Sequence, residues 1–232
     1  AVLSRPFQGR LLREWMSGLE AEKAAIIRDA IRIGYIEGQT TDQIVRRIRG
    51  TKSAGYADGL LEINRKNAQS IVLTAVNHTA NFAANAVYEA NADVVKAVKY
   101  SAVLDTRTTP VCRGRDGSLY PLGAKRPSLP AHIRCRSSYV PVLKSFREMG
   151  IDADDFTATQ RASMDGQVPG DLTYNDWLKR QSAARQDEVL GVAKAKLFRT
   201  GELTLDRFIA RDGAELTLAQ LRQKYPDVFK KA

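Results

Sequence analysis

The sequence has few of the residue types that cross-link chains or bind metals. Its 232 residues include only two cysteines and two histidines, and aromatic residues make up 7%. So few cysteines exclude a small secreted scaffold built on disulfides. The chain has no run of roughly 18 apolar residues, so we expect no transmembrane helix. Its first residues lack the charged-then-apolar layout of a signal peptide, which favours a cytosolic product.

The chain does have a surplus of positive charge. It carries 36 Lys and Arg against 26 Asp and Glu, a net charge of +10. Nine basic and three acidic residues lie in 105–150, whereas 151–232 holds thirteen of each. Such a cluster attracts phosphate backbones or an acidic protein surface, although it can also be a solvated face. The candidates for nucleic-acid or partner binding are Arg113, Arg115, Lys125, Arg126 and Arg134, with Arg107 and Arg136 in the same cluster.

Most residues capable of special chemistry fall in one central segment, residues 100–142. It holds both cysteines and one of the two histidines. This concentration makes the central segment the candidate functional site and the rest of the chain a mainly helical scaffold. The predicted structural motif comprises Asp105, Arg107, Thr108, Cys112, Asp116, Gly117, His132, Cys135 and Arg136.

Three interpretations of the cysteines stay open. Cys112, His132 and Cys135 can bind zinc, because thiolate and imidazole suit that ion. A structural site normally has four protein ligands, and the fourth would be Asp105, Asp116 or His78. The second interpretation is a metal-free network in which Asp105 accepts hydrogen bonds from nearby amides and Arg107 or Arg136 pairs with a carboxylate. The third is a Cys112–Cys135 disulfide, which a cytosolic location disfavours.

An enzymatic site is the weaker interpretation of the same residues. Asp105, Asp116 and His132 could hold a catalytic metal, or Cys112 and His132 could form a nucleophile and base. The chain has no phosphate-binding glycine loop, no HExxH and no GxSxG motif. We therefore expect no catalytic activity.

Helices dominate the predicted fold. Apolar residues at helical spacing predict a helix over 20–33 and a long helix over 68–90. Thr40 to Gln43 has the form of a capping box for a short helix that Gly50 ends. On the long helix, Asn77, Asn81 and Asn85 lie four residues apart and form one polar row. Because Asn is a poor helix former, we expect this row to bind the irregular central segment.

The remaining pattern predicts a small sheet and further helices. Strands are expected over 94–104 and 138–143, joined by an irregular loop from 105 to 134. A polar stretch over 152–170 reads as a linker, and helices are expected over 174–181, 186–199, and after Thr204 and Thr217. The predicted class is α+β and mostly helical, with a long central helix packed on a small β element. The predicted division is 1–58, a core of 59–148, a linker or extended arm of 149–172, and a helical segment of 173–232.

The central motif resembles the phage head morphogenesis, or Mu F-like, minor head proteins. The matching residues are Leu104 to Thr108, Cys112, Asp116-Gly117 and His132 to Arg136. The helix around Thr74 to Asn81 and the turn at Gly38 to Thr41 are similar to the family's lead-in. Residues 173–178 and 190–198 resemble a tail often found on these proteins. Thr109 and Ser137 stand where many members have cysteine, which removes two potential metal ligands.

The resemblance implies a non-catalytic structural protein of the tailed-phage head. It implies a place in the virion, at the portal vertex or the capsid interior, reached by assembly in the host cytoplasm. The implied partners are the portal protein, the major capsid protein and double-stranded DNA, with several copies per virion and no membrane. The implied role is to aid head morphogenesis and DNA packaging or ejection. The alternatives are a metal-dependent nuclease or hydrolase using Asp105, Asp116 and His132, and a stand-alone nucleic-acid-binding module.

Overall fold

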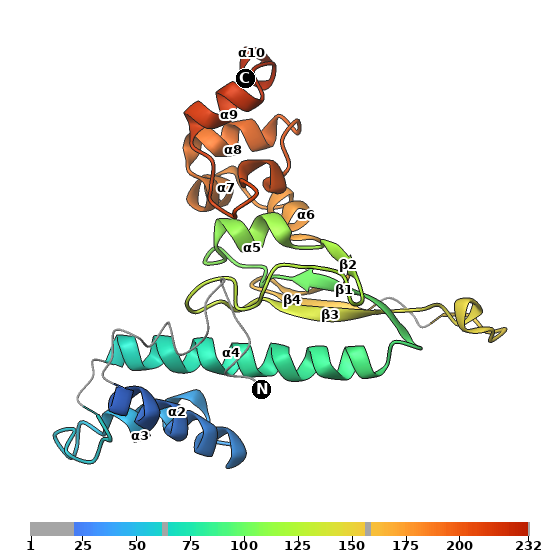
Figure 1. Cartoon of the computed structure of the whole chain (residues 1–232). Coiled ribbons are helices and arrows are strands. Elements are labelled where there is room, and N and C mark those ends of the chain that lie inside the picture. Colours follow the sequence, from blue (N-terminus) through green and yellow to red (C-terminus); the bar gives the residue numbers. More distant parts are fainter. Residues whose placement is uncertain (1–20, 62–64, 156–158, 232) are drawn as a thin grey trace. The chain divides into compact units, whose positions relative to one another are not determined.

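The structure is a computed structural model that describes residues 21–61, 65–155 and 159–231 (Figure 1). The chain divides into two compact units. Unit 1 comprises residues 1–87 and 126–138, and unit 2 comprises 88–125 and 139–232. This division differs from the four segments expected from the sequence, because residues 126–138 return to pack with a much earlier part of the chain.

Unit 1 is built on three helices: α2 (Ala21–Ile36), α3 (Thr41–Arg49) and most of α4 (Arg65–Ala90). The predicted capping box begins α3. The Thr40 side chain accepts a hydrogen bond from the Gln43 amide, and the Gln43 side chain accepts one from the Thr40 amide. Gly50 ends the helix at φ 87°, a conformation that residues with a Cβ rarely adopt.

The core of unit 1 lies where these three helices meet. Its buried members are Ile27 and Ala30 of α2, Ile44, Val45 and Ile48 of α3, and Ala68 and Val72 of α4. Gly34 permits the close approach of α2 and α3, because a Cβ there would lie 2.5 Å from Cγ1 of Ile44. The N-terminal hairpin is therefore held by apolar packing onto the long helix.

Unit 2 contains the three-stranded antiparallel sheet, in the order β2-β1-β3. The strands are β1 (Val95–Ser101), β2 (Leu119–Pro121) and β3 (Ser138–Leu143). The predicted strands over 94–104 and 138–143 are thus confirmed. The loop expected over 105–134 also holds two regular elements, β2 and the short helix α5 (Pro110–Arg115). Proline at the first turn of α5 suits a helix start, since its missing N–H would have no partner there.

Residues expected to form a linker instead contain a β-hairpin. It comprises β4 (Gln160–Ser163) and β5 (Gly166–Pro169), paired antiparallel, with the 3-10 helix η2 (Arg147–Met149) before it. Met164 and Asp165 form the turn, and Gly166, at φ 110°, is the first residue of β5 after it. An isolated parallel bridge joins Ser163 to Leu104, so the hairpin is tied to the end of the strand region. The sequence pattern, interpreted as a linker or extended arm, did not predict this hairpin.

The C-terminal segment is helical, as predicted. Its elements are α6 (Tyr174–Lys179), α7 (Ala183–Leu190), α8 (Val192–Arg199), the 3-10 helix η3 (Leu205–Phe208), α9 (Leu218–Lys224) and α10 (Val228–Lys231). The single helix expected over 186–199 is broken at Gly191, which has φ 75°. The helix expected after Thr217 is α9, which ends at its C-cap residue Tyr225, and the additional short helix α10 follows it.

One core unites the C-terminal helices with the sheet region of unit 2. Tyr174, Trp177, Leu178, Phe198 and Leu221 are almost completely buried in it, together with Leu104. The observed class is α+β, which confirms the predicted class. Within the described residues, no helix has the length and apolar character needed to cross a membrane.

A surface ion pair in unit 2 gives a pH-dependent prediction. Lys96 Nζ donates to Glu148 at 2.7 Å, and the Ser145 amide donates to the same carboxylate at 2.6 Å. Together, chiefly through Lys96, they lower the pKa of Glu148 from 4.5 to about 2. The stabilisation is therefore complete above about pH 4.5 and is lost as the pH falls toward about 2.

We expect an NMR titration of the Glu148 carboxyl carbon to give a pKa of about 2. In Lys96→Met the pKa should rise toward its ordinary value, because the main cause of the shift has been removed. An unchanged pKa in that variant would show that Lys96 is not the cause.

Candidate functional site

In unit 1, a polar stripe on α4 holds the second half of the central motif. Asn77 and Asn81 both donate side-chain hydrogen bonds to the Ser137 carbonyl, at 3.2 and 3.4 Å. Asn85 accepts one from Arg126 at 3.3 Å, and the Thr74 hydroxyl accepts one from the Arg134 amide at 2.9 Å. The prediction that the asparagine row binds the irregular central segment is confirmed. His78, on the same helix, is buried.

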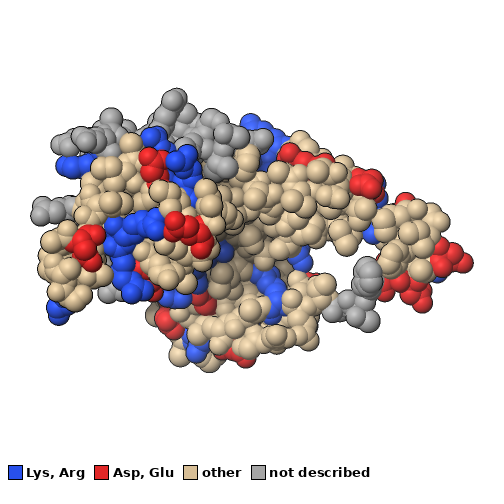
Figure 2. Space-filling view, turned by 90° about the horizontal axis from the view of Figure 1, so that it is seen from below, with Lys and Arg blue, Asp and Glu red and all other residues tan. Residues whose placement is uncertain are grey.

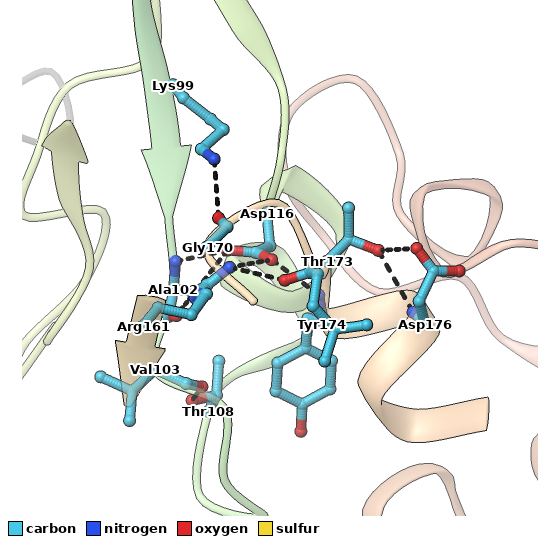
Figure 3. Close-up of polar contacts among 11 residues, drawn as sticks. Lys99, Ala102, Val103, Thr108, Asp116, Arg161, Gly170, Thr173, Tyr174 and Asp176 are labelled. Atoms are coloured by element: carbon cyan, nitrogen blue, oxygen red, sulfur yellow. Dashed lines mark hydrogen bonds and ion pairs between the residues drawn. The ribbon is translucent and has the colours of Figure 1, made fainter. Parts of the chain in front are cut away.

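In unit 2, the carboxylate of Asp116 is the centre of a buried cluster (Figure 3). It accepts hydrogen bonds from the backbone amides of Ala102 and Tyr174, each at 2.6 Å. Both terminal nitrogens of Arg161 lie 3.1 Å from it, one on each oxygen. The Asp116 side chain has no exposed surface and that of Arg161 is 13% exposed. Bidentate charged hydrogen bonds of this kind are strong and fix geometry as well as charge.

Arg161 also donates to two carbonyls, those of Ala102 and Leu172. The Asp116 cluster, meaning Asp116, Arg161 and these backbone groups, thereby joins the end of β1, the β4–β5 hairpin and the start of α6. Gly117 follows at φ 82°, and a Cβ there would lie 2.9 Å from the Thr173 methyl group. The Asp-Gly pair of the motif is thus a structural junction.

A second network surrounds Asp105. The Thr108 hydroxyl lies 2.9 Å from the Asp105 carboxylate and 2.6 Å from the Val103 carbonyl. The Arg107 amide donates to the same carboxylate at 3.1 Å. The Arg107 side chain is 79% exposed, and its Nε forms a long ion pair with Asp105 Oδ2 at 3.7 Å. Tyr174 donates its hydroxyl to the Asp105 carbonyl at 2.7 Å. These bonds match the hydrogen-bonded network expected around Asp105.

The basic residues of the motif do not form one free surface. Arg113 is 7% exposed and donates to the Val189 carbonyl at 2.5 Å, so its guanidinium is committed to the interior of unit 2. Burial lowers the pKa of Arg113 below its ordinary value. Arg126 and Arg134 donate to Asn85 and Gln69 within unit 1. Partner binding by Arg113 is therefore not supported, because its charged group does not reach the surface. Lys125 and Arg136 are exposed and Arg115 is half-buried.

Of the predicted zinc ligands, Cys112 lies in α5 of unit 2, whereas His132 and Cys135 lie in unit 1. Both cysteines are buried free thiols, which does not match the disulfide interpretation, and His132 is half-buried. Two sulfurs and one imidazole suit zinc.

Comparison with protein-family models identifies the family of the chain. The family described as Phage Mu protein F like protein matches residues 25–140, half of the chain. The chain belongs to this Mu F-like family. Searches with the chain find no matching curated protein and no matching solved structure.

The Mu F-like match begins in α2 and ends in β3. It includes the capping box, the α4 stripe and every residue of the predicted motif. The C-terminal helices lie outside the match, so the expected likeness of the tail stays a prediction. Of the two positions that depart from the family pattern, Thr109 precedes α5 and Ser137 supplies the carbonyl that Asn77 and Asn81 bind.

Sequence reasoning missed Arg161 and Tyr174, which complete the Asp116 cluster. Both lie outside the central segment, and Arg161 falls within the predicted linker. The one available signal was the Met164-Asp165-Gly166 stretch, because Asp-Gly between polar alternating residues is typical of a hairpin. No local pattern could have paired Arg161 with an aspartate 45 positions earlier.

Proposed function

We propose that this Mu F-like protein is a structural, non-catalytic minor head protein of a tailed phage. Family membership supports this, since the family consists of phage head morphogenesis proteins. The observation that supports a non-catalytic role is the hydrogen bonding of the Asp116 carboxylate. Its two carboxylate oxygens accept two backbone amides and a bidentate arginine, which leaves little capacity to bind a metal or substrate.

Asp105 supports the same conclusion. Its carboxylate accepts the Thr108 hydroxyl and the Arg107 amide, which are local bonds that shape the turn after Leu104. A hydrolase using Asp105, Asp116 and His132 would need these carboxylates turned toward a common metal. The residues that most resemble catalytic acids are instead used to build unit 2. The hydrogen bonding of Asp105 and Asp116 therefore does not favour the nuclease alternative.

The proposed location is the portal vertex or the capsid interior. The proposed partners are the portal protein or the major capsid protein, with several copies in each particle. The positive net charge of +10 supports contact with packaged DNA or an acidic protein surface. In this role the protein aids head assembly and the packaging or ejection of DNA.

Co-assembly tests this function. The chain is produced together with the portal and major capsid proteins of its phage, and assembled particles are separated on a density gradient. We expect the chain to sediment with the particles and to lose this association when the portal protein is omitted, if the portal is its partner. Retention without portal would assign the partner to the capsid protein. A chain that stays at the top of the gradient in both preparations would contradict a head-associated role.

We further propose that Cys112, His132 and Cys135 hold a structural zinc ion. The two thiolates and the imidazole would hold the ion, and they are the ligand types of structural zinc sites. We expect elemental mass spectrometry to find about one zinc per purified chain, and a chelator to lower the melting temperature. Cys135→Ser should lose the metal, whereas Ser138→Ala, close by in sequence, should keep it. Metal-free protein with an unchanged melt in chelator would exclude the site.

A further inference from the structure

The α2–α3 hairpin presents a charged helix face that the motif does not use. Residues 37–40 connect the two helices, with Gly38 at φ 65°. Two helices joined by a short glycine-containing turn are the arrangement in which many DNA-binding proteins present their second helix. In Figure 2, seen from below, Lys and Arg atoms gather over this hairpin with Asp and Glu atoms beside them.

The two sides of α3 have opposite character. Ile44, Val45 and Ile48 are buried against α2 and α4. The remaining side chains are all polar: Thr41, Asp42, Gln43, Arg46, Arg47 and Arg49. A protein interface normally has an apolar centre, and this face has none. Contacts to the backbone of nucleic acids come instead from arginine and from uncharged polar groups.

The three arginines lie in the last turn of α3 and are held at its surface. Arg46 is exposed, and its Nε donates to the Asp42 carbonyl at 3.3 Å. The Arg49 guanidinium lies 3.9 Å from the centre of the Tyr56 ring, which orients it. Arg47, whose side chain is 29% exposed, pairs at 2.7 Å with Glu37, whose side chain is 49% exposed. Ion pairs near the surface contribute little, so a phosphate can displace the carboxylate.

The loop after α3 keeps this presentation in place. Asp58 accepts two hydrogen bonds from Thr51, one from its amide and one from its hydroxyl, both at 2.7 Å. Gly59 lies directly against Arg49, because a Cβ there would be 2.2 Å from the Arg49 carbonyl carbon. The loop therefore closes on the end of the helix and positions Tyr56 under the Arg49 side chain.

From this face we infer that α3 binds the phosphate backbone of double-stranded DNA through Arg46, Arg47 and Arg49. The inference rests on the proposed function, since a protein of the head interior meets packaged DNA. It places the DNA-binding surface on the N-terminal hairpin and not on the arginines of the motif, of which Arg113 is enclosed within unit 2. Binding of this kind carries no sequence preference.

The test is the salt dependence of binding of the purified full chain to a duplex oligonucleotide. Three phosphate contacts contribute a slope of about −2.7 in log K against log salt. We therefore expect the slope of the Arg46→Gln, Arg47→Gln, Arg49→Gln triple variant to be smaller in magnitude than the wild-type slope by about 2.7. The wild-type affinity should fall about 40-fold more than that of the variant between about 50 and about 200 mM salt. Circular dichroism checks that the variant keeps its fold.

A matched control removes the same charge from another part of the chain. Arg180, Arg211 and Arg222 are exposed in unit 2, and their triple glutamine variant should retain the wild-type slope. If the α3 variant is unstable, Arg46→Gln alone should reduce the slope by about one. Equal losses in both triple variants, an unchanged slope in the α3 variant, or absence of DNA binding at low salt would each overturn the inference. None of these outcomes bears on head association, because the density-gradient co-assembly experiment measures that association independently of DNA binding by α3.

Discussion

Replacing Asp116 by alanine is expected to destabilise the protein by about 3–5 kcal/mol, the usual loss when one partner of a buried ion pair is removed. Arg161 would then stay buried with its charge uncompensated, since its side chain is only 13% exposed. The amides of Ala102 and Tyr174 would also lose their acceptor. Because these groups come from three separate elements, we expect one cooperative loss of structure in unit 2. Urea denaturation followed by circular dichroism measures the change.

Two further variants separate charge from packing. Asp116→Asn keeps the shape but places an NH2 group against donors, so it should also destabilise. Arg161→Met combined with Asp116→Ala should recover part of the stability, because no unpaired charge remains buried. Asp29→Ala is the control. Asp29 forms an exposed i,i+3 pair with Arg32 at 3.6 Å, and its loss should cost less than about 1 kcal/mol. Equal effects of Asp116→Ala and Asp29→Ala would contradict a central role for the Asp116 cluster.

The parts of the fold that could be predicted are those specified by local sequence. The capping box at Thr40 and Gln43 depends on residues three apart, and α3 begins where it was expected. The asparagine row of α4 carried a second kind of signal. Poor helix formers at a spacing of four had to be explained by contacts outside the helix, and Ser137 and Arg126 supply them.

The parts that could not be predicted depend on distant residues or on a single backbone angle. Gly191 looked compatible with one continuous helix, yet its φ of 75° separates α7 from α8. Arg113 looked like part of a basic surface, because charge counts do not show which guanidinium is enclosed by later helices. The candidate ligands Cys112, His132 and Cys135 were identified by residue type and by the three-residue spacing of His132 and Cys135, since few other residues of the chain have that chemistry.

The second large effect is expected for Trp177→Ala, with a loss of about 3–5 kcal/mol, as for other large aromatic residues removed from a core. Trp177 is 2% exposed and lies edge-on to Tyr174, with ring centres 5.0 Å apart. Its indole N–H donates to Asp165 in the turn of the β4–β5 hairpin at 3.0 Å. The substitution therefore opens a cavity among the C-terminal helices and releases the hairpin turn.

Trp177→Phe separates the contribution of core packing from that of the hydrogen bond to Asp165. The phenyl ring still fills most of the space, and the hydrogen bond to Asp165 is lost together with the outer atoms of the indole. Since the Asp165 side chain is 44% exposed, water replaces the lost donor, and we expect a cost of about 1 kcal/mol for the bond. Leu218→Ala, at a residue 40% exposed on α9, should have a smaller effect than Trp177→Ala. Amide hydrogen exchange distinguishes the consequences residue by residue.

In Trp177→Phe, faster exchange should be confined to the β4–β5 turn, because Gln181 also donates to Asp165 and keeps part of the attachment. In Trp177→Ala, the increase should extend through α6 and α7, whose buried side chains share the same core. It should also reach the amide of Tyr174, which binds Asp116. A Trp177→Ala protein in which the Tyr174 amide stays protected would show that the C-terminal core and the Asp116 cluster are independent. Protection lost at both places would show that the C-terminal helices, although outside the Mu F-like match, stabilise the motif itself.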